Sequence, residues 1–151
     1  MMANLPNRKP NRLKRYDYAG NGAYFITICT KDRMCILSRI PVGNAPPSVP
    51  KIELTAIGKI VEEHVRLIPG IDRFVIMPNH VHLIVIKNKT EKSVSEDIRA
   101  LKSVVSRAVG RPIWQKSFYD HSIRDEEDYL TKAEYIENNP SKWMEDELHP
   151  F

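Results

Sequence analysis

Apolar residues recur along the chain at two different spacings, which predict an alternation of strands and helices. Residues 23–30 alternate apolar with other positions and are rich in β-branched and aromatic side chains, which is typical of a strand. The segment 41–50 contains four prolines and one glycine, so we expect a loop there. From Leu54 to Ile68 apolar residues return every three or four positions, which indicates a helix with one apolar face, stopped by Pro69.

The middle of the chain predicts two adjacent strands followed by a second helix. Residues 73–77 and 80–86 are apolar segments separated by Pro78 and Asn79, a pattern that indicates a β-hairpin. The helix after them is predicted from a capping serine, an apolar face and a terminating glycine. These residues are Ser93 or Ser95 for the cap, Ile98, Leu101, Val104, Val105 and Ala108 for the face, and Gly110 for the end.

The last third of the chain adds one strand and one helix. Residues 113–123 are apolar and aromatic and predict a fourth strand. A last helix should begin near Asp125, where four consecutive acids complement the positive end of the helix dipole, and should end at Pro140. The resulting order, β-α-β-β-α-β-α, places the chain in the α+β class. It predicts a ferredoxin-like βαββαβ sandwich with an antiparallel four-stranded sheet and an additional C-terminal helix.

Composition and charge add a basic body to this picture. With 42% hydrophobic and 28% charged residues the chain is typical of a globular protein, and we expect residues 16–151 to form a single domain. Residues 1–123 carry twenty bases and ten acids, a balance that suits a polyanionic partner. Residues 1–15 predict a flexible basic arm that contacts phosphates, through Arg8, Lys9, Arg12, Lys14 and Arg15.

Two histidines on the predicted strand 80–86 are the strongest candidates for chemistry. Successive side chains of a strand point to opposite faces, so His80 and His82 share one face, where two imidazoles can chelate a metal. Val81 and its alternate neighbours face the two helices instead. Ile84 lies on the histidine face, which therefore needs a cover, either the last helix or a partner subunit. By spacing alone, the preferred interpretation is a pair of exposed or hydrogen-bonded histidines without a metal.

The surrounding residues make the histidine pair more specific. The segment 74–85, FVIMPNHVHLIV, resembles the His-hydrophobe-His signature of single-tyrosine (Y1, HUH) transposases of the IS200/IS605 type, with the greatest likeness to the REP-associated tyrosine transposases. The resemblance extends over nearly the whole chain. It includes RYDY at 15–18, YFIT at 24–27, WQKSFYDH at 114–121 and YIENNP at 135–140.

The resemblance implies a nucleophile and a third metal ligand on the last helix. Tyr135 matches the nucleophilic tyrosine of the family, and Asn139 matches the position of an amide near the metal. The spacing of four residues puts both on one helical face, although the position before Pro140 disfavours helical geometry. Tyr129 lies on a different face, since six residues turn a helix by roughly 600°. Without the histidines, Tyr135 reads as a core residue and Asn139 as a helix cap.

Other residues with reactive side chains have simpler interpretations. On the predicted fourth strand, His121 is either a structural partner or an active-site contributor, and Tyr119 serves packing or DNA stacking. His64 and His149 are expected at the surface. The two cysteines are too few for a disulfide framework, and buried free thiols are expected.

The resemblance also implies a mechanism. A phenol with a pKa near 10 is a weak nucleophile and needs help from a divalent ion, Mg²⁺ or Mn²⁺, which two imidazoles and one amide could hold. Tyr135 would form a covalent 5′-phosphotyrosine on hairpin-containing single-stranded DNA and release a 3′-OH, without a nucleotide cofactor. Family members work as dimers, and for this chain a homodimer or a monomer is expected.

Two alternatives without catalysis remain open. A βαββαβ sheet with aromatic residues also fits a nucleic-acid-binding module like the RRM, although the RNP1 pattern is absent and histidines take its place. A catalytically silent, domesticated relative is the second alternative. Neither an apolar run of roughly 20 residues nor a signal peptide is found, so we expect a cytoplasmic, nucleoid-associated bacterial protein.

Overall fold

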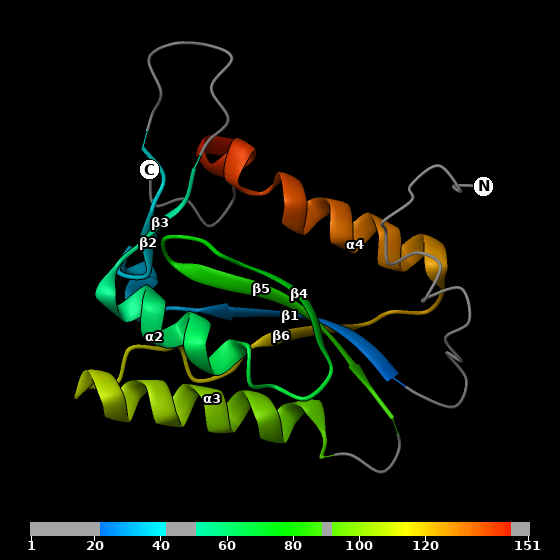
Figure 1. Ribbon diagram of the computed structural model, residues 1–151, viewed down its shortest axis with the longest axis horizontal. Helices are drawn as coiled ribbons and strands as arrows, with labels where there is room; N and C mark the ends of the chain where they lie inside the picture. Colours follow the sequence, from blue (N-terminus) through cyan, green and yellow to red (C-terminus); the bar gives the residue numbers. More distant parts are fainter. Residues whose placement is uncertain (1–21, 42–50, 89–91, 146–151) are drawn as a thin grey trace.

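A four-stranded antiparallel sheet forms the centre of the protein (Figure 1). The computed structural model describes residues 22–41, 51–88 and 92–145, so the predicted basic arm, most of the predicted loop 41–50, and His149 lie outside the described residues. The strands are β1 (Gly22–Cys29), β4 (Ile71–Ile76), β5 (His80–Lys87) and β6 (Tyr119–Ser122). Their order across the sheet is β4-β5-β1-β6, which confirms the predicted ferredoxin-like arrangement.

Helices cover both faces of this sheet. The helices α2 (Ala56–Val65) and α3 (Val94–Val109) lie side by side on one face, and α4 (Glu126–Asn138) crosses the other (Figure 1). The part of the chain that the structure describes has no helix long and apolar enough to cross a membrane. Because α4 lies over the histidine face, the cover of that face is the chain's own last helix, one of the two possibilities that the sequence left open.

Each helix begins where a side chain satisfies its free backbone N–H groups. Thr55 accepts a hydrogen bond from the Gly58 N–H at the start of α2. Ser93 and Glu96 form a capping box at the start of α3, and Gly110 ends that helix with a φ of 93°, as the sequence predicted. Asp125 caps α4 through the Asp128 N–H.

Several predicted boundaries were wrong, and the cause is local. Leu54 does not belong to the helix, because Thr55 caps α2 and leaves the preceding residues to form β3 (Glu53–Leu54), which pairs with β2 (Ser38–Arg39). The fourth strand is four residues long, shorter than the predicted 113–123. After Asn139 the chain does not stop turning but continues as a 3₁₀ helix, η3 (Pro140–Glu145).

Three burial predictions also need correction. Ala108 is exposed, so it is not part of the apolar face of α3. The cysteines are free, as expected, but Cys35 is exposed and Cys29 is only half-buried. A polar residue of α3 that the sequence did not indicate, Asp97, is buried and forms an ion pair with Lys87 at the end of β5.

The two layers of helices enclose two apolar cores. The larger core fills the space between the sheet and the pair α2 and α3, and it receives the side chains Val81, Leu83 and Val85 from β5. The smaller core lies under α4 and receives Phe25 and Ile84 from the sheet. The alternation predicted for β5 is therefore confirmed.

Candidate metal and tyrosine site

The two histidines lie side by side on the sheet face that α4 covers. His80 opposes Cys29 and His82 opposes Thr27 in the β1–β5 register. Their ring centroids are 4.6 Å apart, and both side chains are buried. The predicted common face is thus observed, and the two rings are close enough to bind one ion.

Each ring has a hydrogen-bonding partner at its Nδ1 atom. The Asn79 Oδ1 atom lies 2.8 Å from His80 Nδ1. Because a carboxamide oxygen only accepts, His80 Nδ1 donates this hydrogen bond. For His82 the partner is the Thr27 hydroxyl, 2.8 Å from Nδ1. Because a hydroxyl both donates and accepts, this contact orients the His82 ring without fixing its tautomer.

The electrostatics of His82 favour the neutral form that a metal requires. Burial, together with the neighbouring His80, lowers the pKa of His82 well below its usual range. Among the described residues, the His82 Nε2 atom is buried and has no hydrogen-bond partner. A buried ring nitrogen in this state is costly for folding unless something binds it.

Tyr135 lies beside this pair, as the sequence predicted. Its ring centroid is 5.1 Å from that of His82 and 6.0 Å from that of Phe25, and 44% of the residue is exposed. Tyr135 therefore contacts a buried histidine while nearly half of its surface remains open to solvent.

Tyr129, the other tyrosine of α4, is in a different situation. It is fully buried, its hydroxyl donates to Asp72, and it accepts a hydrogen bond of 2.9 Å from Arg73 Nε. Burial and the hydrogen bond to Asp72 raise the pKa of Tyr129 above its usual value. It joins α4 to β4 and is not accessible to a substrate.

Asn139 occupies the helical ridge between two residues that contact the histidines. Tyr135 lies against His82 four residues before it, and Trp143 lies 6.0 Å from His80, centroid to centroid, four residues after it. Asn139 keeps αR geometry despite Pro140, and it is buried. Its Oδ1 atom has no hydrogen-bond partner among the described residues.

The side chains gathered under the end of α4 are two imidazoles and one carboxamide. No group of three or more His, Cys, Asp or Glu residues able to hold a metal occurs within the residues that the structure describes. The buried Asn139 oxygen is the candidate for a third ligand that the sequence predicted, and its role stays a prediction.

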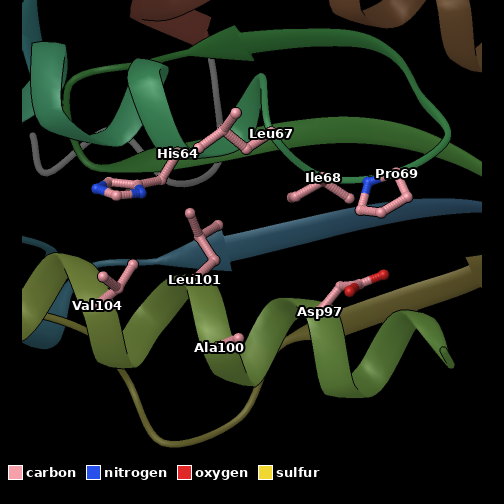
Figure 2. A pocket seen from close by; sticks show the side chains of 8 residues that line it. All are labelled: His64, Leu67, Ile68, Pro69, Asp97, Ala100, Leu101 and Val104. Carbon is pink, nitrogen blue, oxygen red and sulfur yellow. The ribbon is translucent and has the colours of Figure 1, made fainter.

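Two other histidines discussed from the sequence, His121 and His64, have surroundings of their own. His121 bonds through Nε2 to Asp128 at 2.9 Å, which links β6 to the first turn of α4 and favours its structural interpretation. Burial raises the pKa of Asp128, but hydrogen bonds from His121 and the Arg124 N–H lower it more, to a value below the usual one. His64 is half-buried and lines a hollow of about 200 Å³ between α2 and α3, on the opposite side of the sheet (Figure 2).

Sequence reasoning missed three residues that shape the site. Thr27 and Asn79 orient the rings, and Trp143 closes the end of the site next to His80. Asn79 could have been noticed as the polar residue directly before the pair. The other two depend on how distant segments meet, which no local pattern reveals.

Comparisons with known proteins agree with the motif. No family model matches the chain. A Haemophilus influenzae protein without an assigned role is 32% identical over 97% of this chain and 96% of its own length. The Escherichia coli REP-associated tyrosine transposase is 34% identical over 48% of this chain and 44% of that protein.

Two further similarities point the same way. A Haemophilus influenzae protein described as a putative REP-associated tyrosine transposase is 25% identical over 85% of this chain and 75% of its own. The structure of a REP-associated tyrosine transposase bound to a REP hairpin has the same fold, with a TM-score of 0.62, 24% identity, and coverage of 85% of this chain and 72% of that one. With the histidine pair and the helix-borne tyrosine in place, the chain is similar to the REP-associated tyrosine transposases in its sequence motifs and in its fold.

Proposed function

We propose that this protein is a metal-dependent tyrosine transposase that cleaves and rejoins single-stranded DNA carrying a hairpin. One observation carries the proposal. The half-exposed Tyr135 phenol lies against His82, whose buried Nε2 has no hydrogen-bond partner among the described residues. Related proteins are named tyrosine transposases, and the solved structural neighbour was bound to a REP hairpin.

The residues present fit a divalent cation such as Mn²⁺ or Mg²⁺. His80, His82 and Asn139 would hold it, because they supply two neutral imidazoles and one amide oxygen. These donors carry no negative charge, so the anionic DNA phosphate would complete the ligand set. When bound, the ion polarises the phosphate and balances the charge of the transition state.

Tyr135 supplies the nucleophile. Its phenol oxygen attacks the scissile phosphorus, the O–P bond forms as the P–O3′ bond breaks, and the phenol proton leaves to water while the 3′ oxygen gains one. The product is a 5′-phosphotyrosine with a free 3′-OH. Since the phosphodiester energy is kept in this bond, a 3′-OH can reverse the reaction and rejoin the strand without a nucleotide cofactor.

A covalent-adduct assay tests the proposal. The full-length protein is incubated with hairpin-bearing single-stranded DNA and Mn²⁺, and the products are separated under denaturing conditions. We expect an adduct that disappears with Tyr135→Phe or with a chelator. Tyr129→Phe is the matched control, because it removes a hydroxyl from the same helix, and its folded fraction should still form the adduct.

Two other outcomes would contradict the proposal. Tight hairpin binding with no adduct, over a range of hairpin sequences and both metals, would favour a binding module or a catalytically silent relative. An adduct that survives Tyr135→Phe and is lost with Tyr129→Phe would show that the wrong tyrosine was chosen.

A further inference from the structure

A second aromatic residue is exposed on the site's side of the sheet. Among the residues that the structure describes, the exposed large hydrophobic side chains are Leu67, Tyr119 and Tyr135. Tyr119 lies on β6, the edge strand, and is 58% exposed. An exposed aromatic ring on an edge strand contributes nothing to either core, so its presence calls for another explanation.

The sheet register places Tyr119 in line with the metal site. Tyr119 opposes Thr27 on β1, and Thr27 opposes His82 on β5. Directly opposed residues of antiparallel strands project from the same face, so all three side chains share the face under α4. Two strand spacings separate the backbones of Tyr119 and His82 by about 10 Å.

The helix that closes this face leaves Tyr119 open. α4 packs mainly against β4 and β5. Its first turn meets β6 through Asp128 and His121. Phe25 forms the sheet surface between Tyr119 and Tyr135. Its ring stacks on the His82 ring, with ring centroids 5.3 Å apart. The Lys132 ammonium lies 5.4 Å from the centre of the Phe25 ring, so α4 places a positive charge over this part of the sheet.

We propose that Tyr119 is a stacking platform for a nucleobase of the single strand that flanks the cleaved phosphate. The inference rests on the proposed function, since it takes the strand to run from Tyr135 and the histidines toward β6. Lys132 provides charge for the backbone along this path, and the Tyr119 ring provides a flat surface for a base. Stacking of this kind tolerates any base, so the site would add affinity and position the strand without reading its sequence.

The test uses DNA binding by the full-length protein in a Tyr135→Phe background, where no cleavage occurs. The probe is a hairpin oligonucleotide with a single-stranded flank that carries 2-aminopurine at successive positions. We expect Tyr119→Ala to weaken binding roughly 5- to 150-fold, the range of one lost base stack. The salt dependence should stay unchanged, because no phosphate contact is lost. Fluorescence quenching at one flank position should disappear.

Two control variants separate stacking from other effects. Tyr119→Phe keeps the ring and should bind like the parent protein. Leu67→Ala removes a side chain that is 71% exposed on the other side of the sheet, and it should also leave binding unchanged.

The outcomes distinguish this inference from the proposed function. If the wild-type protein forms the adduct but Tyr119→Ala binds DNA with unchanged affinity and quenching, the stacking site is wrong and the proposed function stands. If Tyr119→Phe weakens binding as much as Tyr119→Ala, a hydroxyl contact replaces stacking as the explanation. If the wild-type protein neither binds nor forms an adduct, both proposals fail.

Discussion

The two faces of the sheet are made by the same strands but differ in what they bury. On β5, Val81, Leu83 and Val85 point into the core under α2 and α3, while His80 and His82 point toward α4. The first face is closed by two helices and is nearly all apolar. The second face is closed by one helix, α4, and nitrogen and oxygen atoms are buried where this helix packs on the sheet.

Buried polar groups on the two faces differ in their chemistry. In the larger core, Trp114 Nε1 has no hydrogen-bond partner among the described residues, but an indole N–H only donates and cannot hold a cation. The buried polar pair at the edge of the first face, Lys87 and Asp97, is an ion pair of opposite charges. On the second face, His82 Nε2 and Asn139 Oδ1 are buried without a hydrogen-bond partner among the described residues. A buried atom in that state costs about 1–3 kcal/mol of stability. The first face therefore stabilises the fold, while the second holds atoms suited to an external ligand.

Adjacent residues of β5 allow this division to be tested, and the largest effect is expected for His82→Ala. Removing this imidazole should abolish the DNA adduct and weaken Mn²⁺ binding by at least roughly 100-fold, since changes in residues that merely orient ligands already cost 10- to 100-fold. Titration calorimetry with Mn²⁺ and the denaturing adduct assay measure both effects.

Leu83→Ala is the matched variant on the opposite face. It should lower the free energy of unfolding by about 2–5 kcal/mol, because it opens a cavity in the larger core, and it should leave adduct formation by the folded protein intact. Urea unfolding checks the first statement. Equal loss of adduct in the two variants, at matched folded fractions, would show that the faces are not functionally separate.

The sequence reveals the division of the faces but not the contacts across them. The period of two along β5 is a local property, so the placement of Val81 and His82 on opposite faces could be predicted. The Thr27–His82 contact joins residues 55 positions apart, and the Tyr129–Asp72 contact joins residues 57 positions apart. Both depend on strand register and helix docking, which are set by the packing of the whole chain. Family resemblance identified Tyr135, and burial then separated it from Tyr129.

A smaller effect is expected from Thr27→Val, which keeps the shape of a residue that the sequence did not indicate. The substitution removes the hydroxyl 2.8 Å from His82 Nδ1 and so releases the ring orientation. Mn²⁺ affinity should fall about 10- to 100-fold, while Thr27→Ser should restore it. Calorimetry measures the affinity directly. Unchanged Mn²⁺ binding by Thr27→Val would mean that the neighbouring side chains alone hold His82 in place.

The smallest effect should come from Tyr129→Phe, which concerns the attachment of α4 and not its chemistry. The variant loses the hydrogen bonds to Asp72 and Arg73, and the free energy of unfolding should fall by about 1–2 kcal/mol near neutral pH. The pH dependence gives a second signature. The pKa of Tyr129 is raised in the folded protein. Above pH 10, therefore, the unfolded chain releases a proton that the folded chain retains.

In the wild-type protein, the contribution of the Tyr129 hydroxyl to the free energy of unfolding is thus fully present below pH 10 and declines as the pH rises above that value. Tyr129→Phe should lack that part of the alkaline decline, so the stability curves of the two proteins should converge between pH 10 and 11. Urea unfolding at a series of pH values provides the curves. A constant gap between them through this range would show that Tyr129 has the same pKa in the folded protein as in the unfolded chain.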